Sequence, residues 1–323
     1  MTADETLGGI GESAALARIF PRLPAAVAAL VGPGDDSAVI AAPDGRFVVT
    51  TDMMIHGPDF RLAWSTAHDL GWKAAASNLS DVAAMGAVPT ALVVALAAPA
   101  DTPVGFLDEF ADGLRDGCDA MAPGCGVVGG DLSVSSTLTI AVTAFGDLEG
   151  RAPVLRSGAG LGDVVAVSGV LGAAAAGLRL LFAEAVVGDV PDAELAFALR
   201  AEHPEVMSQL APTPPIADGR RASIAGATAM IDLSDGLVLD ARRLAAASGV
   251  GIDLASASIG SLEALVGGED HSLLATFPAG VALPGGFRPV GTVVGTTGVL
   301  VDGVPFEGRG GWDPYEGWDG EDG

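Results

Sequence analysis

The stretch TAHDLGWKAAASNLSDVAAMGA, residues 66–87, sets a carboxylate, Asp81, within a run of small apolar residues. Thr66 and Asp69 form the T-x-x-D pattern of a helix start, so the stretch predicts a helix beginning there. A helix this rich in alanine is expected to pack against other elements. A charge carried into that packing needs a partner, which the rest of the chain must supply.

A polar stripe runs along the predicted helix, because Lys73, Ser77 and Asp81 recur every four residues. Such a stripe is most simply a polar face on which Lys73 offsets the charge of Asp81. It is also the arrangement expected if the helix forms one wall of a charged site. The spacing alone leaves both interpretations open.

Length and composition bound the class of protein. The 323 residues are enough for about two domains, and half of them are hydrophobic, so a sizeable core can form. No apolar run approaches the ~18 residues of a membrane span, and the N-terminus lacks the basic and apolar parts of a signal peptide. Cys118 and Cys125 lack the spacing of a metal or redox motif. We therefore expect a cytoplasmic protein with free thiols.

The chain is strongly acidic. Its formal charge is −25, and Lys73 is the only lysine. Such a surface repels nucleic acid and anionic membranes, so we expect neither as a partner. It also repels a phosphorylated substrate unless cations intervene.

The order of apolar and helical segments is typical of a two-domain α/β protein of the α+β type. The first unit, 1–149, is expected to hold a helix near 103–121 and strands at 47–51, 90–99, 126–131 and 138–146. The second unit, 150–323, is expected to hold a helix at 171–185 and strands at 162–169, 250–254, 273–278, 287–294 and 298–303.

Residues 228–249 predict a strand, a tight turn and a helix, with Ser234 as N-cap and Gly249 as C-cap. Before them, residues 186–226 contain HPEVMSQLAPTPPIADG. The prolines of this segment favour an irregular connection on the surface.

Aspartates recur beside glycine, serine or threonine at the edges of apolar segments: Asp35 and Asp36 in GPGDDSAVI, Asp52 in VVTTDMM, Asp131 in VVGGDLS, and Asp232 and Asp235 in MIDLSDG. One such aspartate is usually a turn or cap residue. Several, nearly all at predicted strand ends, indicate a converging acidic cluster. Clustered carboxylates raise one another's pKa unless hard cations bind among them, and Mg²⁺ prefers such oxygens together with phosphate. The sequence therefore predicts a metal-dependent phosphate site that lacks a G-x-x-x-x-G-K-[ST] loop.

Two further features are weaker. GGED at 267–270 is a glycine turn with paired acids, and Arg156 is either a phosphate ligand or a plain surface arginine. No G-x-S-x-G or paired Cys/His pattern points to nucleophilic catalysis.

Taken in order, several motifs resemble those of the thiamine-monophosphate kinase family, within the aminoimidazole ribonucleotide synthetase superfamily. They are GDDSAVI, TTDMM, GWKAAASNLSDVAAMGA, VVGGD, LRSGAGLGD, IDLSDG, GGED and GWDPY. The resemblance covers nearly the whole chain and rests on the order and spacing of motifs that are weak singly. It implies an N-terminal domain that binds ATP with magnesium and forms a homodimer, and a C-terminal α/β domain with substrate-side motifs and an acidic tail.

The resemblance also implies three sets of site residues. The Mg²⁺ ligands would be Asp36, Thr50, Thr51, Asp52, Asp81, Asp131, Asp232 and Asp235. Contacts to ATP would come from Gly130, Asp131, Arg156 and Ser234. The substrate, thiamine monophosphate, would lie near Asp59, Glu269 and Tyr315. Asp81 would then be a metal ligand, its charge held by Mg²⁺ and by Lys73.

The implied reaction is direct in-line transfer of the γ-phosphoryl group of ATP, which gives thiamine diphosphate. The acceptor is a phosphate monoester with a second pKa of about 6. It is a dianion near neutral pH, so no general base is required. Several Mg²⁺ ions would screen the repulsion between acceptor and donor.

Three segments depart from the family pattern on the substrate side. GPDF has Asp59 where the family commonly has histidine, QLAPTPPI lacks the family's histidine and arginine, and GGEDH has His271 in place of an aromatic. Asp59 is expected either to face the cationic thiazolium or to point away, with His56 as the replacement donor to the phosphate. Two alternatives stay open: a related enzyme using ATP on another phosphorylated small molecule, and a catalytically weak nucleotide-binding protein.

Overall fold

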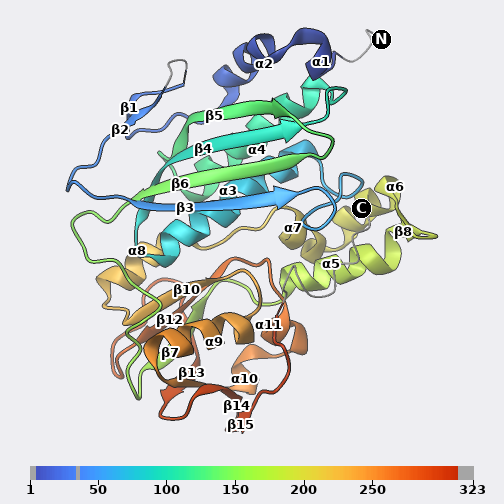
Figure 1. Ribbon diagram of the computed structural model, residues 1–323. Helices are drawn as coiled ribbons and strands as arrows, with labels where there is room; N and C mark the ends of the chain where they lie inside the picture. Colours follow the sequence, from blue (N-terminus) through green and yellow to red (C-terminus); the bar gives the residue numbers. More distant parts are fainter. Residues whose placement is uncertain (1–4, 34–36, 312–323) are drawn as a thin grey trace.

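The computed structural model describes residues 5–33 and 37–311 of the chain. Two main sheets, one from each half of the sequence, form the framework, and the four-stranded sheet lies above the seven-stranded sheet in Figure 1. Every strand expected from the sequence overlaps an observed strand. Among the described residues, no helix is both long and apolar enough to cross a membrane.

In the described part of the chain, helices cover one face of the four-stranded sheet. Its spatial order is β3 (Val48–Ile55), β6 (Thr139–Asp147), β4 (Val88–Ala98) and β5 (Gly126–Val134). Neighbouring strands are antiparallel except β4 and β5. The helices α3 (Ala67–Ala84) and α4 (Val104–Met121) cover one face, and the other is turned toward the viewer in Figure 1. The N-terminal segment adds α1 (Leu7–Ile10), α2 (Glu12–Ile19), a 3₁₀ turn η1 (Phe20–Arg22) and the paired strands β1 (Ala29–Val31) and β2 (Val39–Ile40).

Glycines allow α3 and α4 to pack backbone against backbone. A Cβ on Gly71 would lie 2.1 Å from the carbonyl oxygen of Phe110, and one on Gly113 would lie 2.0 Å from that of His68. Both distances are far below van der Waals contact, so a side chain at either position would force the helices apart. The alanine-rich α3 is thus buried along most of its length.

The start of α3 is as predicted. The Thr66 side chain accepts the backbone N–H of Asp69, and the Asp69 carboxylate accepts that of Thr66, a complete capping box. The same carboxylate also accepts both terminal nitrogens of Arg200, at 2.6 and 3.0 Å. A bidentate pair of this kind fixes the helix start against α6 (Ala193–Glu202) of the other half of the chain.

The seven-stranded sheet is mostly antiparallel. Its order is β10 (Ala229–Leu233), β12 (Ser272–Phe277), β7 (Val164–Ser168), β13 (Arg288–Val294), β11 (Gly251–Leu254), β14 (Gly298–Val301) and β15 (Val304–Pro305). Only the β11–β14 pair is parallel. Helix α9 (Leu237–Ser248) packs on β10, β11 and β14. The short α10 (Ser256–Ile259) and α11 (Leu262–Val266) and the longer α5 (Ala173–Glu184) complete this part.

The predicted irregular connection at 186–226 is wrong. This segment forms a hairpin of β8 (Val186–Val187) and β9 (Val190–Pro191), then α6, α7 (Pro204–Leu210) and α8 (Ile216–Ile224). Pro204 occupies the first turn of α7, where a missing N–H leaves no hydrogen bond unmade. Pro215 directly precedes α8 in the same way. The prolines start helices here rather than break them.

Ser234 is not a helix N-cap. Helix α9 begins at Leu237, with Gly236 in the cap position at φ 131° and no side-chain cap bond. The Asp235 backbone N–H instead donates to the Asp240 carboxylate, at 3.1 Å. Gly249 does end the helix in the left-handed conformation, as predicted.

Helix α3 connects the two halves of the molecule, because it packs on α8 and β10 as well as on its own sheet. The contact with α8 is close: a Cβ on Gly219 would lie 2.1 Å from the Ala83 carbonyl oxygen. The C-terminal part of α3 therefore lies beside β10, where the next acidic motif begins. The division into domains at 149/150 stays a prediction.

Candidate active site

A cavity of about 350 Å³, here called the acidic cavity, lies where α3 and β3 meet β10 and the loop 267–271. Its lining is dominated by carboxylates: Asp52, Met53, Met54, Asp59, Lys73, Ser77, Asp81, Arg156, Asp232, Ser234, Asp235, Glu269 and His271. Lys73, Ser77 and Asp81 all contribute, so the polar stripe of α3 is the wall of a cavity rather than a plain surface face. Most site residues predicted from the sequence meet here.

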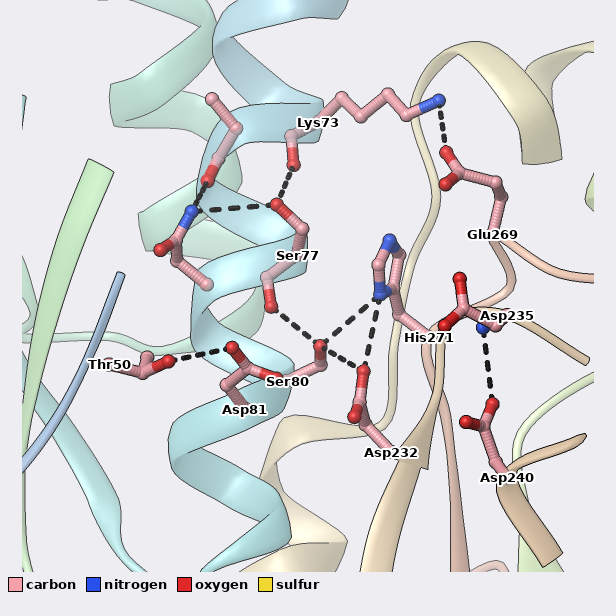
Figure 2. A network of polar contacts seen from close by, with 12 residues as sticks. Thr50, Lys73, Ser77, Ser80, Asp81, Asp232, Asp235, Asp240, Glu269 and His271 are labelled. Atoms are coloured by element: carbon pink, nitrogen blue, oxygen red, sulfur yellow. Dashed lines mark hydrogen bonds and ion pairs between the residues drawn. The ribbon is translucent and has the colours of Figure 1, made fainter. Parts of the chain in front are cut away.

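Asp81, on α3, lies between Thr50 and Ser80 in the polar network (Figure 2). Its Oδ2 accepts the hydroxyl of Thr50 on β3, at 2.8 Å. Burial, and then the charge of Asp232, raise the pKa of Asp81 to about 7. The hydrogen bond from Thr50 lowers this pKa, but by less than the other two effects raise it. The structure therefore holds this carboxylate where ionisation is unfavourable unless a cation is present.

Asp52 and Asp59 extend the negative charge toward the end of β3. Partial withdrawal from water inside the cavity raises the pKa of both carboxyls. The Asp59 side chain accepts the backbone N–H of Ile55 at 2.7 Å, which closes the loop after β3 and aims this carboxyl into the cavity. Asp59 thus lines the acidic cavity, and its contact with the thiazolium stays a prediction.

Asp232, on β10, approaches α3 from the opposite side. Ser80 donates to Ser77 O at 2.7 Å and lies 3.4 Å from both Asp232 Oδ2 and His271 Nδ1 (Figure 2). His271 Nδ1 is 3.5 Å from Asp232 Oδ2. Burial opposes protonation of His271, but the contact with Asp232 and the charge of Glu269 outweigh it and raise the histidine pKa. The histidine that replaces the family aromatic thus belongs to the charge network.

The sequence suggested that Lys73 pairs with Asp81, but the structure shows a different partner. Lys73 Nζ lies 2.6 Å from Glu269 Oε2 and donates to the Gln209 carbonyl oxygen at 3.2 Å. Burial acts to raise the pKa of Glu269, but the positive charges nearby, chiefly that of Lys73, outweigh it, so this pKa is lowered. Glu269 itself has φ 70°, a left-handed conformation that only the surrounding contacts can maintain in a residue other than glycine.

A second cavity, of about 550 Å³ and here called the apolar cavity, adjoins the first. Asp81, Arg156 and Asp232 line both. The remaining walls are mainly apolar and come from β3, the end of α3 and β10: Arg46, Phe47, Val48, Val49, Thr50, Ala84, Met85, Leu148, Pro153, Met230 and Ile231. An apolar cavity that opens onto carboxylates and an arginine has the character of a site for a ring system attached to an anionic chain.

Some predicted residues lie elsewhere. Thr51 points to the opposite face of β3, where its hydroxyl donates to Val142 O at 3.0 Å. Asp131 is in register with Met53 across two intervening strands, roughly 14 Å away at the usual strand spacing. Gly130, beside it, has a local packing reason, since a Cβ there would lie 2.0 Å from Val94 O.

Asp131 and Gly130 line a separate, largely apolar cavity beside α2 and η1. Asp52 and Asp131 also lie inside β3 and β5 rather than at strand ends, because both strands run further than predicted. Asp36 and Tyr315 lie outside the described residues.

Sequence reasoning missed Asp240. This residue of α9 is 1% exposed, and burial, then the charge of Asp232, raise its pKa to about 7. It accepts from the Asp235 backbone and from Arg243 at 2.6 Å, so it supports the turn that presents Asp235 (Figure 2). Nothing in the local sequence distinguishes Asp240 from an exposed helix acid.

The donor set suits a hard cation shared with a phosphate. In the described part of the chain, no three His, Cys, Asp or Glu side chains are close enough to hold a metal ion on their own. Yet Asp52, Asp81 and Asp232 face the same space, and each of the first two has a raised pKa. Phosphate oxygens are the ligands that would complete such a shell.

Comparison with known proteins agrees with this arrangement. Residues 34–148 match the family AIR synthase related protein, N-terminal domain. A thiamine-monophosphate kinase from Mycobacterium tuberculosis (strain ATCC 25618 / H37Rv) is 45% identical over 97% of this chain and 94% of its own length. The chain belongs to the thiamine-monophosphate kinase family.

Solved structures of the family have the same fold. The thiamine-monophosphate kinase of Stenotrophomonas maltophilia K279a superposes with a TM-score of 0.74 at 31% identity, covering 91% of this chain and 96% of that one. AaThiL complexed with AMPPCP and TMP gives a TM-score of 0.71 at 34% identity, covering 85% and 90%. The two-domain α/β architecture of the family is therefore that of this protein.

Proposed function

We propose that this protein transfers the γ-phosphoryl group of ATP directly to thiamine monophosphate, giving thiamine diphosphate and ADP. One observation carries the proposal: two cavities, one apolar and one acidic, adjoin at Asp81, Arg156 and Asp232. This geometry fits a nucleotide and a second phosphorylated ligand whose phosphates meet at the shared residues. The relative AaThiL, complexed with AMPPCP and TMP, supports the choice of ligands.

The nucleotide base belongs in the apolar cavity. Met85, Leu148 and Met230 offer it apolar contacts, and Arg156 stands at the junction as a cation for the phosphate chain. Ser234, across the acidic cavity, is a candidate hydroxyl donor to the same phosphates. Gly130 and Asp131 remain predicted ATP contacts from the sequence resemblance.

Magnesium fits this donor set and would supply charge screening between donor and acceptor phosphates. Asp52, Asp81, Asp232 and Asp235 would hold it, with Thr50 fixing the orientation of Asp81. Thr51, Asp131 and Asp36 stay predictions, the first two because they lie apart from the acidic cavity. No residue acts as general base, since the acceptor phosphate is already ionised near neutral pH.

The thiazolium ring is a cation, and the acidic cavity offers it two carboxylates. Glu269 is held ionised by Lys73, and Asp59 faces the same space. The loss of the family histidine at position 59 thus replaces a donor by an attractive charge for the ring. Tyr315 stays a predicted contact to the thiamine.

The test is ATP turnover by the purified protein with and without thiamine monophosphate at saturating Mg²⁺, with the product identified by mass. Formation of thiamine diphosphate in step with ADP is expected. ADP release that requires a different phosphate ester would identify a related enzyme on another substrate. Nucleotide binding without turnover on any such ester would identify a weak binding protein. Either result overturns the proposal.

A homodimer through the open face of the four-stranded sheet is also proposed. Phe47, Val49 and Met53 are 58%, 54% and 55% exposed, and Phe47 packs beside Phe145, with ring centroids 5.6 Å apart. The apolar residues extend from β3 to β6, because Val49 pairs with Phe145 and Met53 with Ala141, with the hydrogen-bonded pair Thr51–Thr143 between them. A second copy of the chain is the occupant that the family resemblance supplies. A cytoplasmic location is likewise proposed.

A further inference from the structure

Lys73, the only lysine of the chain, is nearly inaccessible, with 4% of its surface exposed. It extends from the N-terminal half of α3 toward Glu269 of the loop 267–271 (Figure 2). Two acceptors surround its ammonium group: Glu269 Oε2 at 2.6 Å and the Gln209 carbonyl oxygen at 3.2 Å. An ammonium group has three N–H donors, so these two contacts leave one for a ligand in the acidic cavity, which Lys73 lines.

The positive charges of the two cavities are divided unequally. Arg156 lines both and stands at their junction, Arg46 lines the apolar cavity alone, and Lys73 and His271 line the acidic cavity alone. Arg243 lies behind the cavity wall and pairs with Asp235 and Asp240. Of the lysine and arginine side chains, Lys73 is the one that lines only the acidic cavity, where many carboxylates would otherwise repel a phosphate.

We propose that Lys73 binds the phosphate of the acceptor while it holds Glu269 for the cationic ring. This inference rests on the proposed function. One ammonium group would then recognise both ends of the substrate: directly at the phosphate, and through Glu269 at the thiazolium. The Gln209 carbonyl oxygen, on α7, fixes the ammonium from behind, so the lysine is held in position before the substrate arrives.

The alternative is that Lys73 only neutralises Glu269. The two roles are separable because thiamine has the ring but lacks the phosphate. If the lysine contacts the phosphate, its replacement weakens the binding of thiamine monophosphate and leaves the binding of thiamine unchanged. If the lysine only orients Glu269, its replacement weakens the binding of both ligands while Glu269 is present. Once Glu269 has been replaced by glutamine, it weakens the binding of neither.

The experiment measures binding of thiamine and thiamine monophosphate by calorimetry, with Mg²⁺ and AMPPCP present, in the full-length protein. The matched pair is Glu269→Gln, which leaves the ammonium of Lys73 as the one charge of the former ion pair, and the double variant Lys73→Met/Glu269→Gln, which leaves none. Adding Lys73→Met to Glu269→Gln is expected to weaken the binding of thiamine monophosphate by about 10- to 100-fold, the effect of losing one charge-assisted hydrogen bond. Thiamine binding should change less than about twofold.

Lys73→Arg is expected to recover part of the phosphate affinity, because the charge returns with a different shape. Unchanged binding of AMPPCP shows that each variant is folded. An equal loss for both ligands, or no loss for thiamine monophosphate, overturns the role of Lys73 while leaving the proposed function standing. A wild-type protein that neither binds nor phosphorylates thiamine monophosphate overturns both.

Discussion

Replacing Asp81 by asparagine should stabilise the metal-free protein and inactivate the enzyme. The pKa of Asp81 is raised from 3.8 to about 7, chiefly by burial and then by Asp232. Each factor of ten in an ionisation equilibrium is about 1.4 kcal/mol, so ionised Asp81 disfavours the folded state by up to about 4 kcal/mol. Asparagine removes that charge and can still accept from the Thr50 hydroxyl. The variant should therefore gain up to about 4 kcal/mol at pH 8 in EDTA, a rise in Tm of roughly 5–10 °C.

The gain should depend on pH in a defined direction. A carboxyl whose folded pKa is raised is protonated in the folded protein but ionised in the unfolded chain between about pH 4 and 7, so its contribution is fully present below about pH 4, is lost progressively as pH rises, and is gone above about 7. Below about pH 4 wild type and Asp81→Asn should melt together, and the difference should open between about pH 4 and 7 and stay nearly constant above. Mg²⁺ should then raise the Tm of the wild type more at pH 8 than at pH 5, and raise that of the variant much less.

Thermal melts in EDTA and in saturating Mg²⁺, with turnover measured in parallel, check these expectations. Activity should fall at least about 100-fold, as for loss of a metal contact. Asp240→Asn is the matched control, because its carboxyl has the same raised pKa but does not line the acidic cavity, and an asparagine oxygen can still accept the backbone N–H of Asp235. It should keep the Mg²⁺ response and most of the activity. An Asp81→Asn protein that is less stable in EDTA at pH 8, or that turns over normally in Mg²⁺, would refute the reasoning.

The remaining predictions concern the substrate loop and the sheet face. Asp59→His should raise the KM for thiamine monophosphate by several-fold while the KM for ATP and the Mg²⁺ requirement stay constant, and His56→Ala should do the same if His56 is the phosphate donor. Wild-type kinetics in both would remove the loop from recognition. Light scattering at micromolar concentration should give the mass of a dimer, and Met53→Asp, which places a charge on the open sheet face at a residue that is 55% exposed, should shift it toward monomer. A monomeric wild type contradicts the interface.

Much of the fold was predictable because its signals are local. The strands of both sheets are apolar runs bounded by turn residues, and Thr66 and Asp69 mark the start of α3 by a pattern confirmed in atomic detail. The helices at 186–226 were missed because Pro204 and Pro215 have two opposite meanings in a sequence. A proline disrupts a helix interior but suits the first turn, and only the surrounding packing decides between them.

The candidate site was predictable as a set of charges but not as a set of pairs. The aspartate motifs indicated which carboxylates converge, and Asp52, Asp81 and Asp232 do line one cavity. The partner of Lys73 was not predictable from spacing. Helical spacing placed it near Asp81, whereas the tertiary fold brings Glu269, from the far end of the chain, to 2.6 Å from its ammonium.

The loop 267–271 shows why such pairs depend on the whole fold. Glu269 and His271 both have left-handed backbone conformations, at φ 70° and 50°, each of which costs roughly 1–3 kcal/mol outside glycine. Asp270, between them, is 4% exposed and accepts backbone N–H groups of Gly172 and Ala174 at the start of α5. Capping that helix offsets the strain. The side chains before and after Asp270 are thereby directed to opposite partners, Glu269 to Lys73 and His271 to Asp232. The strained loop 267–271 therefore carries charged residues of the acidic cavity and is held in place at the start of α5. Asp270 fixes both the start of that helix and the loop that lines the cavity.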